Sequence, residues 1–367
     1  MIINIISIGA LAIWLYLYFA HGHFWVSKPE LPPAVPRDCP HVDVIIPARN
    51  EAEHIAAVVA SLLAQSYGGK VRLILVDDNS NDGTAESAGS APRLLVIRGQ
   101  PKPAVWSGKL WALHQGVAAS RAALLLFTDA DIIHDPRHLS ALVARLLDSK
   151  LDLVSEMVRL NCSSLAERAL VPAFVFFFQM LYPFERVNDP SARIAAAAGG
   201  TVLIRREALQ RIGGLESIKH ALIDDVTLAR SVKAHGAIYL GHSALAHSIR
   251  PYPHFKDLWA MIARTAFTQL RYSAALLALT VLGLMLVWLA PLVAAVCGHG
   301  WTRAAGAAAC ALGAASYLPT LRRYGQSGLW SLALPLIALF YLAATLGSAL
   351  DHWRGTGARW KSRTYGA

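Results

Sequence analysis

The chain has 367 residues, of which 55% are hydrophobic and only 16% charged, a balance too apolar for an ordinary soluble globular protein. The formal net charge is +10. The basic residues are scattered without a stacking-aromatic motif, which argues against nucleic acid as a partner. Four cysteines without a C-x-x-C pair indicate neither a zinc site nor a disulfide framework.

Uncharged segments near both ends predict membrane helices. Residues 2–20, 276–297 and 329–350 are each close to the ~20 residues needed to cross a bilayer. We expect the first segment (1–22) to be a retained membrane anchor. A signal peptide would need basic residues before its apolar segment, and the first charged residue is Lys28. The Ala- and Gly-rich segment 304–318 has about 15 residues, so we expect it to be packed or re-entrant rather than fully crossing.

The placement of basic residues predicts which side of the membrane holds the middle of the chain. Lys28 and Arg37 follow the first segment, and Arg264 and Arg271 precede the second, which favours a cytoplasmic location. Anionic membrane lipids are the expected partners of this basic excess. With two crossings in the region 273–350, the basic tail 351–367 also returns to the cytoplasm.

Residues 23–40 contain five prolines and are expected to form a stiff linker. An α/β domain over 41–272 should follow, because apolar runs at 42–48, 71–77, 93–99 and 123–128 alternate with helical patterns. The helix within 51–65 places Ile55, Val58, Val59, Leu62 and Leu63 on one face. We expect a mainly parallel sheet. Residues 169–184 are too short and Pro-broken to span, and fit either an interfacial or a core helix.

Pairs of acidic residues follow two of the predicted strands. Asp78 follows one strand and Asp129 and Asp131 follow another, at the strand ends where open α/β sheets bind ligands. Carboxylates spaced i and i+2 suit Mg²⁺ or Mn²⁺ together with substrate phosphates. An isolated Asp-x-Asp would more simply cap a strand, but the second acidic site favours a ligand.

Three further motifs carry possible chemistry. Asp224 and Asp225 precede a helix, where one could be the N-cap while the other serves as a general base. Lys109 precedes another helix and could meet a diphosphate. Gly199 and Gly200 precede a strand, as expected where the backbone approaches a ligand, although a plain turn explains them almost as well.

Six motifs in order resemble those of family 2 inverting glycosyltransferases: "VIIPARNE", "LVDDNSNDGT", "FTDAD", "AAAGGTVLIRREAL", "IDDVTLA" and "TQLRYS". Through "WSGKLWALHQG" and the apolar C-terminal part, the chain is more similar to the membrane-anchored branch with ceramide glucosyltransferase and the bacterial hopene-associated glycosyltransferases. The resemblance implies a GT-A fold, a nucleotide-sugar donor with a leaning toward uridine diphosphate, a lipid acceptor and a multi-pass location in the bacterial inner membrane.

The resemblance also implies residue roles. Donor binding would involve Pro47, Ala48, Glu51, Asp78, Lys109, Asp129, Gln269, Arg271 and Tyr272. Asp129 and Asp131 would hold Mg²⁺ or Mn²⁺, Asp225 with Asp224 would supply the base, and Gly199 and Gly200 would face the acceptor. Tyr272 stands where the family signature has tryptophan.

Other functions remain as alternatives. A processive polysaccharide synthase would normally need more spans, to form a polymer channel. A catalytically silent membrane scaffold of the same fold would not need three acidic sites. A P-loop or Rossmann enzyme would need glycine motifs that the chain lacks. No pattern indicates an oligomeric state.

Overall fold

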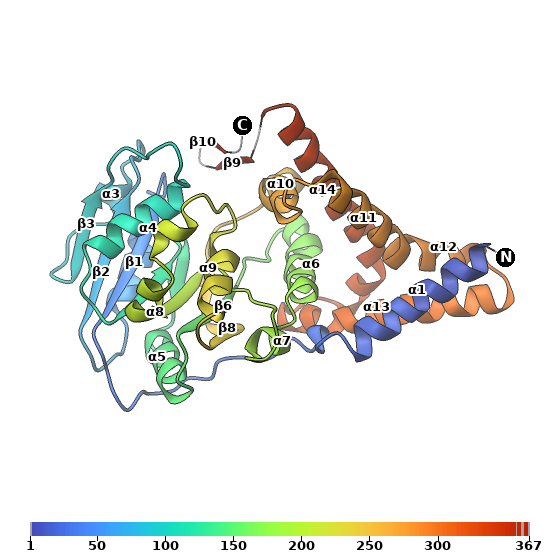
Figure 1. Ribbon diagram of the computed structural model, residues 1–367, viewed down its shortest axis with the longest axis horizontal. Helices are drawn as coiled ribbons and strands as arrows, with labels where there is room; N and C mark the ends of the chain where they lie inside the picture. The colour runs from blue at the N-terminus through green and yellow to red at the C-terminus, as the bar shows by residue number, and fades with distance from the viewer. Residues whose placement is uncertain (1, 357, 361–362, 366–367) are drawn as a thin grey trace. The chain divides into compact units, whose positions relative to one another are not determined.

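A computed structural model describes residues 2–356, 358–360 and 363–365 (Figure 1). The chain divides into two compact units. The helical unit contains Met1–Ser27, Cys162–Glu185 and Tyr252–Ala367, and the α/β unit contains Lys28–Asn161 and Arg186–Pro251. Two segments inside the range 41–272, the range predicted for the α/β domain, therefore pack with the apolar helices. Lys361 of the predicted basic tail lies outside the described residues.

Within the described residues, the α/β unit has one eight-stranded sheet in the order β3-β2-β1-β4-β7-β6-β8-β5. Its strands are β1 (Val42–Ala48), β2 (Val71–Asp77), β3 (Leu94–Arg98), β4 (Leu124–Thr128), β5 (Ile132–His134), β6 (Leu153–Arg159), β7 (Thr201–Arg205) and β8 (Ile238–Ser248). The strands β3, β2, β1 and β4 are parallel, as predicted.

The other half of the sheet is mixed, so the prediction of a mainly parallel sheet is wrong there. Strand β7 runs antiparallel to both β4 and β6, and β5 runs antiparallel to β8. The reversal of β7 pairs Thr201, its first residue, with Thr128, the last residue of β4. The glycine turn before β7 is thereby placed at the edge of the sheet where β4 ends.

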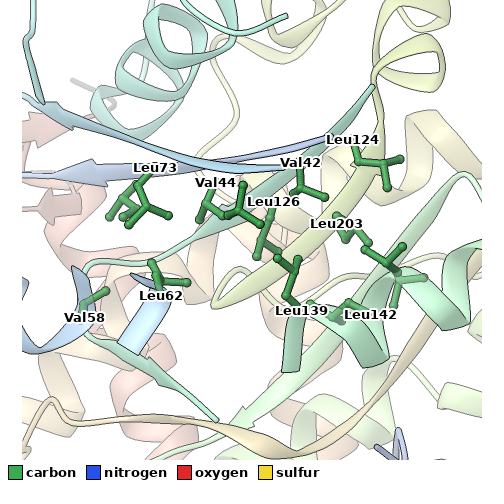
Figure 2. Packing of buried hydrophobic residues seen from close by; sticks show 14 of the residues in the cluster. Val42, Val44, Val58, Leu62, Leu73, Leu124, Leu126, Leu139, Leu142 and Leu203 are labelled. Atoms are coloured by element: carbon green, nitrogen blue, oxygen red, sulfur yellow. The ribbon is translucent and has the colours of Figure 1, made fainter. Parts of the chain in front are cut away.

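Helices cover this sheet and build its core. They are α2 (Ile55–Leu63), α3 (Thr84–Ser87), α4 (Gly108–Ala118), α5 (His138–Asp148), α8 (Arg206–Arg211), α9 (Asp224–Lys233) and the 3-10 helix η2 (Leu215–Ile218), with α7 (Phe184–Asn188) at the unit boundary. Val58 and Leu62 of α2 and Leu142 of α5 belong to the same buried cluster as Val44 and Leu126 of the sheet (Figure 2). Each such side chain contributes roughly 1.5–3 kcal/mol by burial.

The helical unit contains the apolar segments. Its elements are α1 (Ile2–Phe19), η1 (Phe24–Val26), α6 (Leu165–Leu181), α10 (Phe255–Gln269), α11 (Ala274–Leu284), the π-helical η3 (Met285–Leu289), α12 (Ala290–Cys297), α13 (Gly300–Arg323), η4 (Gly328–Ala333) and α14 (Leu334–Trp353), and the tail forms strands β9 (Ala358–Trp360) and β10 (Arg363–Tyr365). By length and composition, Ala274–Cys297, Gly300–Arg323 and Gly328–Trp353 could each cross a membrane, and Ile3–Phe19 is a shorter apolar helix.

The helix predicted at 304–318 is longer than expected. It is α13, with 24 residues, because polar residues at both ends continue the helix beyond the apolar segment. Its glycines allow close packing: a Cβ on Gly313 would lie 3.0 Å from the ring of Trp14. At ~1.5 Å per residue, α13 is long enough to cross a bilayer, so the argument from a short segment fails.

Helix α6 corresponds to the segment that fitted either an interfacial or a core helix. Phe176 is fully buried, and its ring packs on Phe24 and Tyr317 of the same unit. Ser164 and Glu167 form a capping box at the start of the helix. At Phe176, helix α6 is therefore a core helix, which is one of the two predicted alternatives.

Candidate active site

The ends of β1 and β2 bring together the four residues predicted for the nucleoside pocket. Pro47 and Ala48 lie beside Val76 and Asp77 in the parallel register. The N–H of Asp78 donates to the carbonyl of Ala48 at 2.8 Å.

The loops that follow these two strands are tied to each other. The N–H of Glu51 donates to Thr84 Oγ1 at 2.8 Å, and the N–H of Asn50 donates to Ser80 Oγ at 2.9 Å. Glu51 and Asp78 are both buried. The two strand ends therefore form one rigid rim of the site.

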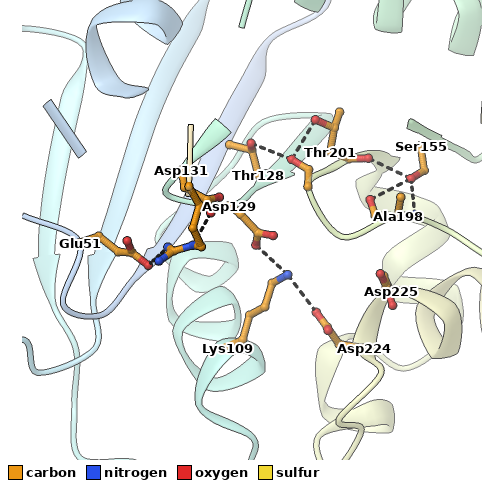
Figure 3. A network of polar contacts seen from close by, with 12 residues as sticks. Glu51, Lys109, Thr128, Asp129, Asp131, Ser155, Ala198, Thr201, Asp224 and Asp225 are labelled. Atoms are coloured by element: carbon orange, nitrogen blue, oxygen red, sulfur yellow. Dashed lines mark hydrogen bonds and ion pairs between the residues drawn. The ribbon is translucent and has the colours of Figure 1, made fainter. Parts of the chain in front are cut away.

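Lys109 connects acidic residues from two different elements. Its Nζ lies 2.7 Å from Asp129 Oδ1, just after β4, and 3.6 Å from Asp224 Oδ2 at the start of α9 (Figure 3). Burial alone would lower the pKa of Lys109, but Asp129 and Asp224 raise it above its ordinary value. The lysine is therefore a permanent cation at the centre of the site.

Helix α9 begins at Asp224, and its N-cap residue is Ile223. The expectation that one of the two aspartates could be the N-cap is therefore wrong. Asp225 Oδ1 accepts a hydrogen bond from the N–H of Val226 at 2.7 Å. The pKa of Asp225 is raised to about 7. Burial is the main cause and the negative charge of Asp224 adds to it, while Lys109 opposes the shift. A carboxyl group that titrates near neutrality is suited to general base catalysis.

Apolar side chains line the pocket around Asp225, which is half-buried. One pocket is lined by the polar residues Lys109, Asp224 and Asp225, by Gly199, and by Leu110, Leu113, Phe127, Val202, Leu215 and Leu228. The carboxyl group thus lies against a hydrophobic wall, which disfavours its charged form.

The two predicted glycines lie against this group. A Cβ on Gly199 would lie 3.1 Å from Lys109 Nζ and 3.2 Å from Asp225 Oδ2, and a Cβ on Gly200 would lie 3.0 Å from Val158 Cγ2. Both distances at Gly199 are tighter than ordinary contacts, so the absence of a side chain lets the turn approach Lys109 and Asp225. The glycine motif is therefore more than a plain turn.

Arg250 was not identified from the sequence. Its Nη2 donates to Glu51 Oε1 at 2.5 Å and its Nε donates to Asp131 Oδ2 at 2.6 Å. Burial raises the pKa of Asp131, while Arg250 acts in the opposite direction. Arg250 follows β8, which lies between β6 and β5 in the sheet, and no local sequence pattern predicts the pairing of β8 with β5.

The donor set at Asp129 and Asp131 fits a hard divalent cation as part of a ligand shell. Both side chains supply only oxygen, the ligand type that Mg²⁺ and Mn²⁺ prefer. No group of three or more His, Cys, Asp or Glu side chains in the described part of the chain could hold a metal by itself. The remaining ligands would have to come from a bound diphosphate and water.

Gln269, Arg271 and Tyr272 belong to the helical unit, and the contacts found for Gln269 and Tyr272 lie inside it. Gln269 Nε2 donates to Tyr182 Oη at 2.5 Å, and Tyr272 stacks on His352 with ring centroids 4.4 Å apart. The other predicted site residues all lie in the α/β unit.

Comparisons with known proteins concern the α/β domain and its fold. Residues 43–213 match the model of the family described as "Glycosyl transferase family 2". Over these residues, slightly less than half of the chain, the protein is similar to a family 2 glycosyltransferase domain. Its sheet and helices have the α/β GT-A architecture, and the chain aligns over 95% of its length, with a TM-score of 0.57 and 20% identity, to 99% of the mannosyltransferase PcManGT from Pyrobaculum calidifontis in complex with GDP-Man and Mn²⁺.

Two curated relatives are similar over shorter segments. The 4,4'-diaponeurosporenoate glycosyltransferase of Staphylococcus haemolyticus is 35% identical over 98 residues, which are 26% of each chain. The glucosyl-3-phosphoglycerate synthase of Mycolicibacterium paratuberculosis is 34% identical over 95 residues, 25% of this chain and 29% of that protein. The matched segments thus span little more than a quarter of these relatives.

Proposed function

We propose that this protein is a membrane-bound glycosyltransferase that moves a sugar, with inversion, from a nucleotide-sugar donor to a lipid hydroxyl. The observation that carries the proposal is the ion-pair chain from Asp129 through Lys109 to Asp224, with Asp225 beside it. A base that titrates near pH 7 and a cation lie in one small site, which suits removal of a proton from the acceptor hydroxyl and departure of a diphosphate from the sugar.

In the proposed reaction, Asp225 takes the proton of the acceptor hydroxyl as that oxygen attacks the anomeric carbon in line. Lys109 offsets the charge that develops on the departing nucleoside diphosphate. Asp129 and Asp131 would hold Mg²⁺ or Mn²⁺, which would stabilise the same charge when bound. The rim formed by Glu51 and Asp78 would hold the nucleoside, with a leaning toward uridine diphosphate.

The lipid acceptor is supported by the apolar helices of the same chain. A transferase fixed to the bilayer meets a lipid head group without extracting it from the membrane. The Staphylococcus haemolyticus relative is named a 4,4'-diaponeurosporenoate glycosyltransferase. We place the α/β unit on the cytoplasmic side of a bacterial inner membrane, and a hopanoid or another glycolipid is the proposed class of product.

The test is transfer by detergent-purified protein offered several nucleotide sugars, Mn²⁺ or Mg²⁺ and a bacterial lipid extract. We expect a new glycolipid carrying one added sugar, and loss of the product in Asp131→Ala and Asp225→Asn. Asp148→Asn, an exposed acid at the end of α5, is the matched control and should retain activity. Polymeric products would favour a synthase, and transfer only to soluble acceptors would contradict the lipid acceptor.

A further inference from the structure

Four buried polar side chains from four elements form a continuous hydrogen-bonded chain that the proposed reaction does not use. Thr128 Oγ1 lies 3.0 Å from His134 Nε2, His134 Nδ1 lies 2.8 Å from His138 Nδ1, and His138 Nε2 lies 2.6 Å from Glu156 Oε2. All four residues are at most 3% exposed. We call these residues the buried polar chain.

The direction of each hydrogen bond follows from the atoms at one end. Thr128 Oγ1 donates to the carbonyl of Gly200 at 2.9 Å, because a carbonyl oxygen can only accept. The same hydroxyl therefore accepts from the N–H at His134 Nε2. Burial lowers the pKa of His134, which leaves this ring neutral and its Nδ1 an acceptor for His138. His138 Nε2 and Glu156 Oε2 form the last of the three links, while Glu156 Oε1 is buried and has no hydrogen-bond partner.

A polar arrangement of this kind is costly if its only purpose is to fill space. Apolar residues of similar volume generally serve a protein core as well or better. The hydrogen-bonded links of a buried network instead favour one geometry, because a displacement at any link leaves a further polar atom unpaired. The geometry fixed here is the distance between the end of β4 and the carbonyl of Gly200.

The turn that receives this hydrogen bond is also held from β6. Ser155 Oγ accepts from the N–H of Ala198 at 2.8 Å and lies 2.9 Å from the carbonyl of Thr201 (Figure 3). Gly199, in the middle of this turn, is the residue that lies against Lys109 and Asp225. Displacing the turn would therefore change the space around the proposed base.

We propose that the buried polar chain is a positioning device for the proposed active site: it fixes the Gly199–Gly200 turn to the end of β4 and so sets the position of the acceptor relative to Asp225. This inference rests on the proposed function. None of its members reaches the substrate, and each acts through Gly200. Thr128 is the link to the turn, and Glu156 is the most distant anchor.

The first test separates positioning from folding. Thr128→Val removes the hydroxyl at nearly constant volume, Thr128→Ser retains it, and Glu156→Leu breaks the far end. We expect Thr128→Val and Glu156→Leu each to lower kcat about tenfold while the KM for the donor changes less than about threefold. Thr128→Ser should retain most of the activity, and the double variant Thr128→Val/Glu156→Leu should be no slower than the slower single variant.

The control is Leu142→Ala, because Leu142 is fully buried on α5 but does not belong to the buried polar chain. It should lower the melting temperature without changing kcat per folded molecule. A similar loss of kcat in Leu142→Ala, additive effects in the double variant, or no rescue by serine would overturn the positioning role.

A second measurement does not depend on activity. Hydrogen–deuterium exchange of the full-length protein should increase over residues 195–205 in Thr128→Val and Glu156→Leu, but not in Leu142→Ala. Unchanged exchange over these residues would refute the inference. If the wild type transfers no sugar while the exchange result holds, the proposed function fails and the link between the chain and the turn stands.

Discussion

Asp225 makes a prediction that concerns both activity and stability. Its pKa of about 7 lies above the ordinary value of 3.8 because the carboxyl group is buried. The folded protein therefore binds more protons than the unfolded chain between about pH 4 and 7, and burying the charge costs stability increasingly as the pH rises through this window. At pH 8 the full cost is present.

We expect Asp225→Asn to reduce kcat at least about a hundredfold while raising the melting temperature by about a few degrees at pH 8. The gain should shrink toward pH 5, where much of the wild-type carboxyl is protonated. For the wild type, kcat/KM should rise with pH to a plateau above about 7. Thermal melts of both proteins at pH 5 and 8 provide the check, and a melting temperature of the variant below that of the wild type at pH 8 would contradict the argument.

Arg250 leads to a prediction about cation binding without a nucleotide. Its guanidinium group lies between Glu51 and Asp131 at 2.5 and 2.6 Å, so it competes with any other cation for Asp131. Arg250→Met removes this charge, and Mn²⁺ alone should then bind several-fold more tightly. Arg250→Lys, which keeps a positive charge, is the matched control. Titration of free Mn²⁺ by electron paramagnetic resonance measures the effect, and equal affinities in the wild type and the methionine variant would count against it.

At the scale of elements, the turn before β7 carries the third prediction. Gly199→Ala introduces a methyl group 3.1 Å from Lys109 Nζ and 3.2 Å from Asp225 Oδ2, so the charged pair must shift. We expect kcat to fall about tenfold with a small change in melting temperature. Gly283→Ala on α11 meets nothing within 4 Å and should leave activity intact. A fully active Gly199→Ala enzyme would show that the contact is not needed.

The elements that could be predicted from the sequence are those with strong local patterns. The strand at 42–48 is β1 residue for residue, and the helical face of Ile55, Val58 and Leu62 is buried as expected. The orientation of β7 was not predictable, because an apolar strand has the same pattern in either direction. Arg250 was missed because its partners lie 119 and 199 residues away in the sequence. Local motifs thus identified the acids and glycines but not the groups that tertiary pairing brings to them.

At the scale of the whole molecule, contacts within the helical unit bear on which helices cross the membrane. Helix α13 runs alongside α1 in the same direction: Thr302 near its start bonds to Asn4 near the start of α1, and Arg323 at its end bonds to Ser27, which follows the end of α1. If α1 crosses the bilayer, α13 therefore crosses it too. The segment from α11 to α12 ends beside the first turns of α13. It would therefore cross in the direction opposite to that of α13.

Helix α14 has the length and composition of a span, but both of its ends lie at the same end of the helical unit. It begins after η4, which packs on the last turns of α13, and its final residue Trp353 packs on Phe267 of α10, shortly before α11 begins. We therefore expect α14 to lie across the cytoplasmic side of the bundle. In this arrangement α13 would cross the membrane and α14 would not, and the basic tail would return to the cytoplasm, as the positive-inside tendency favours.

A reporter fused after Ala367 tests this arrangement together with one inserted at the turn before α13. We expect a cytoplasmic signal from the C-terminal fusion and a periplasmic signal from a tag between Gly298 and Gly300. A third tag at Gly325, between α13 and α14, should read cytoplasmic, because the end of α13 lies beside Ser27, which we propose to be on the cytoplasmic side of the first helix. A periplasmic C-terminus with a cytoplasmic tag at Gly325 would mean that α14 crosses after all, and the basic tail would then lie on the side that its charge disfavours.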